Sequence, residues 1–164
     1  WQDEFEVAGA PSEANWNYDI GRGSNGWGNN EAQYYTDRSD NVKVEDGLLK
    51  ITAKKETYEG AEYTSARLLT QDKFEFTYGR VDVRAKLAGG GGTWPAIWML
   101  GTKRSELGWP ACGEIDIMEH VGYDPDFIHA NIHTEAYNHA IGTNKGNRIR
   151  VEDPWSDFHI YAVE

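Results

Sequence analysis

The sequence predicts an all-β protein, an antiparallel β-sandwich, and three observations lead to this prediction. Short apolar runs recur along the 164-residue chain with the two-residue alternation of half-buried strands. Glycine- and asparagine-rich segments separate these runs, as turns separate the strands of an antiparallel sheet. No segment offers the sustained periodicity of an amphipathic helix. Many short strands joined by such turns are typical of a sandwich.

The first predicted hairpin joins residues 41–44 to residues 48–54, with Asp46 and Gly47 between them. An Asp-Gly pair between two strands favours a tight hairpin turn. Further on, apolar residues alternate on one parity and then on the other, in the order Phe74, Phe76, Tyr78, then Val81, Val83, Ala85, Leu87. The parity changes at Gly79, which predicts a bulge or bend in one extended segment.

Residues 89–92 are four consecutive glycines, which predict a flexible turn leading into a strand at 94–100. A phosphate-binding loop is excluded because neither Lys-Ser/Thr nor a helical pattern follows the glycines. Further strands are predicted at 112–120, 127–134, 148–152 and 158–163. The whole chain, 1–164, is predicted to belong to a single domain, since no linker or repeat divides it.

Composition limits the partners. The chain has 16 basic and 27 acidic residues and a formal net charge of −11, so we expect neither nucleic acid nor an anionic membrane surface as a partner. No apolar run approaches the ~20 residues of a membrane-spanning helix. A neutral polysaccharide is compatible with this charge, and seven Trp and nine Tyr supply rings that could stack on sugars.

The most informative segment runs from Glu114 to Glu119 and interleaves three carboxylates with large apolar residues. On a strand, Glu114 and Asp116 share one face, whereas Glu119 lies an odd number of residues from both and would face away. A single β-bulge near Met118 would return Glu119 to the carboxylate face. Such a set suits a retaining glycosidase, which needs a nucleophile, an acid/base and a group that adjusts their pKa values. The structural alternative is three surface carboxylates on an exposed strand.

The residues around this segment resemble glycoside hydrolase family 16, in its bulged, laminarinase-like branch. The matching segments are the Glu-x-Asp-x-x-Glu motif itself and residues 1–5, 27–36, 63–68 and 92–100, and they follow the order of the family along the whole chain. The resemblance implies a β-jelly roll of the concanavalin A-like kind. It also implies a secreted, extracellular bacterial enzyme whose signal peptide is absent from this chain.

The resemblance implies a role for each carboxylate. Glu114 would be the nucleophile and Glu119 the acid/base. Asp116 would share a proton with Glu114 and, by charge repulsion, help to keep Glu119 protonated. The predicted reaction is endo-hydrolysis of β-1,3-glucan of the laminarin type, and also of mixed-linkage β-1,3-1,4-glucan, with retention of configuration.

Other residues are predicted to bind the polysaccharide. Trp94 and Trp98 share a strand face and, by resemblance, stack on sugars, although core packing is an alternative for Trp98. Trp109 would cap the cleft or anchor its own loop. The remaining candidates are His133, Asn30 and Arg67, with a buried ion pair as the structural alternative for Arg67. A zinc site formed by His129 and His133 would require a helix, which the β-rich context disfavours.

No cofactor is expected for catalysis. By resemblance, a structural Ca²⁺ would bind Glu4 and the backbone carbonyl of Gly47, with an aspartate from the C-terminal part of family members completing the site. Oxygen ligands suit calcium.

The chain ends at Glu164, inside a predicted strand, whereas family members continue for several more strands. We therefore expect the C-terminal strands of the domain to be missing from this chain and to be supplied by a missing segment or a second chain. Two other functions stay open. One is a non-catalytic β-glucan-binding or recognition protein. The other is a retaining hydrolase of another marine polysaccharide, such as agarose.

Overall fold

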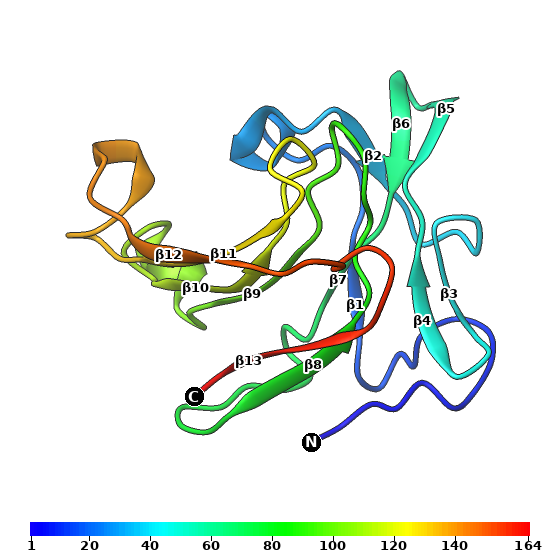
Figure 1. Ribbon diagram of the computed structural model, residues 1–164, viewed down its shortest axis with the longest axis horizontal. Helices are drawn as coiled ribbons and strands as arrows, with labels where there is room; N and C mark the ends of the chain where they lie inside the picture. The colour runs from blue at the N-terminus through cyan, green and yellow to red at the C-terminus, as the bar shows by residue number, and fades with distance from the viewer. The chain divides into compact units, whose positions relative to one another are not determined.

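The computed structural model describes residues 1–164, which form two compact units, Trp1–Glu75 and Phe76–Glu164. Strands dominate both units, and Figure 1 labels each of them. None of the helices is long and apolar enough to cross a membrane. The prediction of an all-β chain is therefore correct for each unit.

The first unit contains seven strands in three sheets, with the orders β1-β7, β2-β6-β5 and β3-β4. The strands are β1 (Asn17–Asp19), β2 (Gln33–Tyr35), β3 (Val42–Glu45), β4 (Leu48–Ile51), β5 (Lys54–Tyr58), β6 (Ala61–Ser65) and β7 (Arg67–Leu69), and a π-helical turn, η1 (Gly26–Asn30), precedes β2. The hairpin between β3 and β4 is confirmed. Asp46 and Gly47 both have positive φ, 57° and 71°, as this tight hairpin turn requires.

Two predictions for this unit are wrong in detail. The strand expected at 48–54 ends at Ile51, because both backbone polar groups of Thr52 form hydrogen bonds with the fully buried Asn41 instead of with a neighbouring strand. Its carbonyl accepts from the Thr52 N–H and its side-chain amide donates to the Thr52 carbonyl. The pairing is also not antiparallel throughout, since β2 and β6 are parallel.

The second unit contains a four-stranded sheet with the order β12-β11-β10-β9 and a two-stranded sheet, β13-β8 (Figure 1). Its elements are β8 (Val81–Ala85), β9 (Ala96–Leu100), α1 (Arg104–Leu107), β10 (Glu114–Glu119), β11 (Phe127–His133), the 3₁₀ turn η2 (His139–Ile141), β12 (Lys145–Arg150) and β13 (His159–Val163). All strand pairs of this unit are antiparallel.

The core of this unit forms where the two sheets face each other. Its buried members are Leu87, Ile117, Met118, Ile128 and Tyr161, which come from β10, β11, β13 and the end of the β8 segment. One face of β10 is therefore anchored in the core, which leaves its opposite face for polar side chains.

Two boundaries differ from the prediction here. Residues 74–78, at the boundary of the two units, form no strand: Phe76 and Tyr78 are exposed, at 44% and 93%, whereas the Phe74 ring stacks on Trp1 of the first unit at 5.1 Å. The strand expected at 148–152 begins earlier, at Lys145. It is an exposed edge strand, and such a strand lacks the apolar alternation that marks a half-buried one.

Candidate active site

A β-bulge in β10 places all three carboxylates on one face. Against β9 the register runs Glu114↔Leu100 to Asp116↔Trp98 and then shifts, so that Met118 opposes Ile97 and Ile117 is the extra residue. Ile117 and Met118 are both buried in the core, at 8% and 1% exposed. Because two consecutive residues enter the core, Glu119 returns to the face of Glu114 and Asp116. The predicted bulge is confirmed.

Neighbouring strands complete this face through residues directly opposite the carboxylates. His133 of β11 opposes Glu114, and Trp98 of β9 opposes Asp116. The sequence interpretation of residues 127–134 as a strand is confirmed, and the helix that a zinc site at His129 and His133 would need does not form.

Glu114, Asp116 and His133 form a tight buried cluster. His133 Nε2 lies 3.2 Å from Asp116 Oδ2 and 3.8 Å from Glu114 Oε1. The side chains of His133 and Asp116 are each 6% exposed, whereas that of Glu114 is 16% exposed. Glu114 therefore presents the most accessible carboxylate of the cluster.

Burial and charge give these two carboxyls different proton affinities. Burial, together with the charges of Glu114 and Glu119, raises the pKa of Asp116 to about 8. Burial also raises the pKa of Glu114, but His133 and hydrogen bonds from Trp109 and Asp116 oppose that rise. The raised pKa of Asp116 favours its protonated form, which can donate a hydrogen bond to the neighbouring Glu114 carboxylate.

Glu119 is held by two N–H donors, one on each oxygen. The indole Nε1 of Trp94 donates to Oε1 at 2.9 Å, and the amide Nδ2 of Asn131 donates to Oε2 at 2.9 Å. Trp94 is 60% exposed, so its ring lies open to solvent directly beside this carboxyl. Trp94 and Trp98 both adjoin the carboxylates, although β9 begins at Ala96 and only Trp98 lies within it.

Trp109 belongs to an aromatic cluster with two histidines. Its ring centroid lies 4.9 Å from that of His139 and 5.9 Å from that of His133, and the two histidine rings meet edge to face at 5.1 Å. The Nδ1 of His133 is buried without a hydrogen-bond partner. His139 was not among the predicted residues, because it follows a turn and no strand parity marks it.

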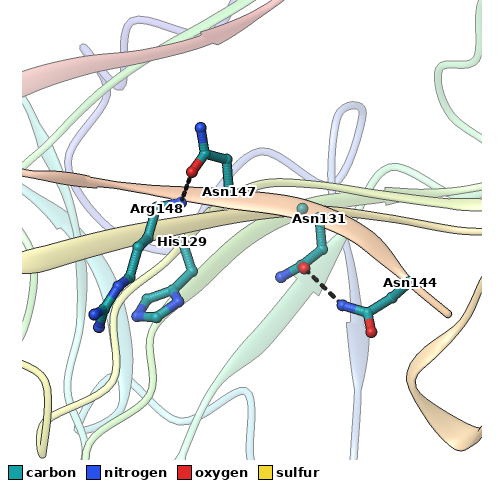
Figure 2. Close-up of a pocket in the computed structure, with 6 residues that line it drawn as sticks. His129, Asn131, Asn144, Asn147 and Arg148 are labelled. Carbon is teal, nitrogen blue, oxygen red and sulfur yellow. Dashed lines mark hydrogen bonds between the residues drawn. The ribbon is translucent and has the colours of Figure 1, made fainter. Parts of the chain in front are cut away.

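A cavity of about 290 Å³ lies over β11 and β12, and Asn131, which lines it, contacts Glu119. It is lined by His129, Asn131, Asn144, Gly146, Asn147 and Arg148, five of which Figure 2 labels. Asn144 Nδ2 donates to Asn131 Oδ1 at 3.1 Å, and the Asn147 side chain accepts from the Arg148 backbone N–H at 2.8 Å. Asn131 and Asn144 were also missed; the shared strand parity of Asn131 with His133 was the available signal for Asn131.

Asn30 and Arg67 lie in the first unit. Arg67 pairs with Asp19, Nε to Oδ2 at 3.0 Å, and its guanidinium lies 4.8 Å from the ring centroid of Trp27. These contacts match the structural alternative for Arg67, a paired cation. Asn30 is exposed at the end of η1, with a φ of 57°.

One set of residues brings oxygen and nitrogen atoms close enough together to hold a metal. Glu114, Asp116 and His133 each present a ligand atom within 4.8 Å of the others. Glu4 is exposed beside a cavity of about 440 Å³, and Gly47 lies at the exposed tip of the β3–β4 turn. Glu4 and Gly47 fit the oxygen chemistry that calcium prefers, but they supply only two or three of its six to eight oxygens.

Several known proteins are similar to this chain. The family model described as "Glycosyl hydrolases family 16" matches residues 29–164. A "Beta-glucanase" from Rhodothermus marinus is 53% identical over all of this chain and 58% of its own length. The X-ray structure of the laminarinase from Rhodothermus marinus superposes with a TM-score of 0.96, at 53% identity, over all of this chain and 66% of that one.

A second solved structure is described as a non-specific endo-β-1,3(4)-glucanase variant with an oligosaccharide at its active site. It matches with a TM-score of 0.94 and 51% identity, over 99% of this chain and 65% of that one. The chain thus spans about three fifths to two thirds of the length of these relatives. At such identity and TM-score, the jelly-roll fold of these laminarinases is also the fold class of this chain.

Proposed function

The chain belongs to glycosyl hydrolases family 16, and from this premise we propose that its protein is an endo-acting β-1,3-glucanase that retains anomeric configuration. One observation carries the proposal. The bulge at Ile117 aligns Glu114, Asp116 and Glu119 on one face of β10, with the middle carboxyl, Asp116, only 6% exposed.

Glu114 is the nucleophile of the proposed first step. It attacks the anomeric carbon while Glu119 protonates the oxygen of the departing sugar, so that a glycosyl–enzyme ester forms and one chain fragment leaves. Glu114 suits this role because it is the most exposed member of its cluster, at 16%. The Trp109 and Asp116 hydrogen bonds stabilise its charged form.

In the proposed mechanism Asp116 is protonated and neutral beside Glu114, rather than a second negative charge. A charged Asp116 would place two carboxylates side by side in a buried site, whereas the protonated group donates a hydrogen bond instead. When the ester forms, Glu114 loses its negative charge and the hydrogen bond weakens. When the ester breaks, that bond favours the returning carboxylate.

Water completes the proposed cycle. Glu119, now ionised, removes a proton from a water molecule that attacks the anomeric carbon, and the ester to Glu114 is cleaved with the original configuration restored. Trp94 and Trp98, which adjoin the carboxylates, supply aromatic surfaces for the sugars, and Trp109 borders Glu114.

Laminarin-type β-1,3-glucan is the proposed substrate, with mixed-linkage glucan as a second. The names of the relatives, a laminarinase and a non-specific endo-β-1,3(4)-glucanase, support this choice.

We also propose that the protein is secreted from a bacterial cell, because its polymeric substrate lies outside the cell. This chain would be part of a single catalytic domain. Asn30 is also proposed as a sugar contact, whereas Arg67 is paired with Asp19 and lies over the Trp27 ring.

A structural calcium ion bound by Glu4 and the Gly47 carbonyl belongs to the proposal but not to the chemistry. Water or further protein oxygens would have to complete its shell. Adding a chelator should lower the melting temperature of the protein and leave the pH profile of the remaining activity unchanged. A chelator without effect on melting would remove this part of the proposal.

The test is product release from laminarin, with the anomeric configuration of new reducing ends followed by NMR. We expect β-configured oligosaccharides from the protein and none from its Glu114→Ser variant. Products that first appear in the α configuration would exclude retention. Binding of laminarin without any hydrolysis would instead favour the glucan-recognition function.

A further inference from the structure

Asn131 reaches Glu119 from the strand next to β10. The residue directly opposite Glu119 on β11 is His129, whose Nε2 pairs with Asp124 at 3.1 Å. Asn131 lies two residues further along β11, on the same face, and its amide donates to Glu119 Oε2 at 2.9 Å. Glu119 therefore receives a donor anchored in the sheet, in addition to the exposed indole of Trp94.

The orientation of the Asn131 amide is fixed from its other side. Its Oδ1 accepts a hydrogen bond from Asn144 Nδ2 at 3.1 Å, as Figure 2 shows, so its NH₂ group has to face Glu119. A flipped amide would bring oxygen against a carboxylate and an NH₂ group against another NH₂ group. Both contacts are unfavourable.

Gly146 provides the space that this arrangement needs. It lies opposite Asn131 on β12, and a Cβ at this position would lie 2.1 Å from Asn131 Oδ1 and 2.7 Å from the Ala130 carbonyl oxygen. Real Cβ atoms do not approach other atoms so closely, and the Ala130 carbonyl is part of the β11–β12 pairing. A side chain here would therefore push the Asn131 amide out of place.

We propose that Asn131 is a positioning residue for the acid/base Glu119, oriented by Asn144 and accommodated by Gly146. This inference rests on the proposed function. The Asn131 bond anchors Oε2 to the sheet, so the Glu119 carboxyl is held in one rotation, with Oε1 beside the exposed Trp94. Asn131 touches neither the nucleophile nor the reacting bond and acts only through Glu119.

The experiment compares two substrates in wild type and Asn131→Ala. Laminarin needs its leaving oxygen protonated, whereas a dinitrophenyl β-laminaribioside has a leaving group that departs without a proton. We expect kcat/KM for laminarin to fall about 30-fold and kcat/KM for the aryl substrate to change by less than about 3-fold, since misplacing a catalytic group slows only the step that uses it.

Two further pairs of variants separate positioning from damage to the fold. Gly146→Ala should reproduce the selective loss although it removes no hydrogen-bonding group, and Gly91→Ala, where a Cβ meets nothing within 4 Å, is its control. Asn147→Ala is the control for Asn131→Ala, because Asn147 lines the same cavity but bonds only the Arg148 backbone. Melting temperatures are recorded for all four variants.

The outcomes are distinct. Equal losses on both substrates, or no loss in Asn131→Ala and Gly146→Ala, would overturn the positioning role while wild-type activity on laminarin upholds the proposed function. A wild-type protein that cleaves neither substrate would overturn the proposed function itself, and this inference with it. If Asn131→Ala fails to fold, the Gly146→Ala comparison decides on the same criterion.

Discussion

Asp116 Oδ2 lies 3.2 Å from His133 Nε2, and each side chain is only 6% exposed. Asp116 therefore lies between a ring nitrogen and the carboxyl of Glu114, with almost no solvent to stabilise a charge of its own. This position explains why the proton of the pair stays on Asp116 and why Glu114 is the carboxylate available for attack.

The buried proton predicts an unusual pH dependence of stability. The pKa of Asp116 is about 8 in the folded protein against an ordinary value of 3.8, so the folded state binds the proton more tightly than the unfolded state. Its contribution to stability is fully present below pH 3.8 and is lost as the pH rises through about 8.

Asp116→Asn should remove this loss, because an amide does not titrate. At pH 7 we expect the variant to have a free energy of unfolding about 4 kcal/mol higher than wild type, with the difference shrinking toward pH 4. Its glucan hydrolysis should fall, since the shared proton is gone. Urea unfolding at several pH values measures the difference; parallel curves for the two proteins would contradict the assignment of the proton.

His133→Gln should move the acidic limb of the kcat/KM profile to higher pH. The charge of His133 lowers the pKa of Glu114 against the effect of burial, and the nucleophile must be ionised to attack. The other groups facing Glu114 are Asp116, Glu119 and the Trp109 indole, and the variant leaves them in place. A limb at the wild-type pH would show that His133 does not influence the nucleophile.

Glu119→Gln should lower glucan hydrolysis by about 100- to 10,000-fold, because the amide cannot give a proton to the leaving oxygen. Adding azide to this variant with an activated aryl substrate should yield a β-configured glycosyl azide, since a small anion needs no general base. The azide product is identified by NMR. An α-configured azide would show that no glycosyl–enzyme ester forms.

Gly101→Ala should destabilise the second unit without touching any site residue. A Cβ at this position would lie 1.9 Å from the Cys112 carbonyl oxygen, and the Gly101 N–H donates to the Gly113 carbonyl just before β10. We expect a loss of about 3 kcal/mol in the free energy of unfolding, measured by urea titration, because two backbone segments must move apart. Gly91→Ala, with open space at its Cβ, should cost far less.

The catalytic strand could be predicted from the sequence because its signal is local. Glu114 and Asp116 share one strand parity and Glu119 has the other, so the three can share a face only if the strand has a bulge. The apolar residues between them, Ile117 and Met118, mark the opposite face as the one that enters the core. In the first unit, the β3–β4 hairpin could be predicted from its Asp-Gly turn, but the parallel pairing could not. A parallel pair such as β2 and β6 depends on segments far apart in sequence, with no alternation to reveal it.

Three site residues, Asn131, Asn144 and His139, were not predicted, because their contacts depend on segments that are distant in sequence. Asn131 carried a parity signal but no sign that its amide would reach Glu119, because that contact depends on the register shift between β10 and β11. Asn144 and His139 lie outside the strands, in or beside turns, where side-chain direction follows no period. Their roles became visible only through hydrogen bonds and ring contacts.

Trapping the covalent intermediate on β10 tests the proposed mechanism most directly. A dinitrophenyl β-laminaribioside fluorinated beside its anomeric carbon should form the glycosyl ester quickly and release it slowly, so that peptide mass spectrometry can locate it. We expect one sugar ester, on Glu114, and none in Glu114→Ser. An ester on Glu119 or on another residue, or turnover of glucan with no ester in the trapping experiment, would contradict it.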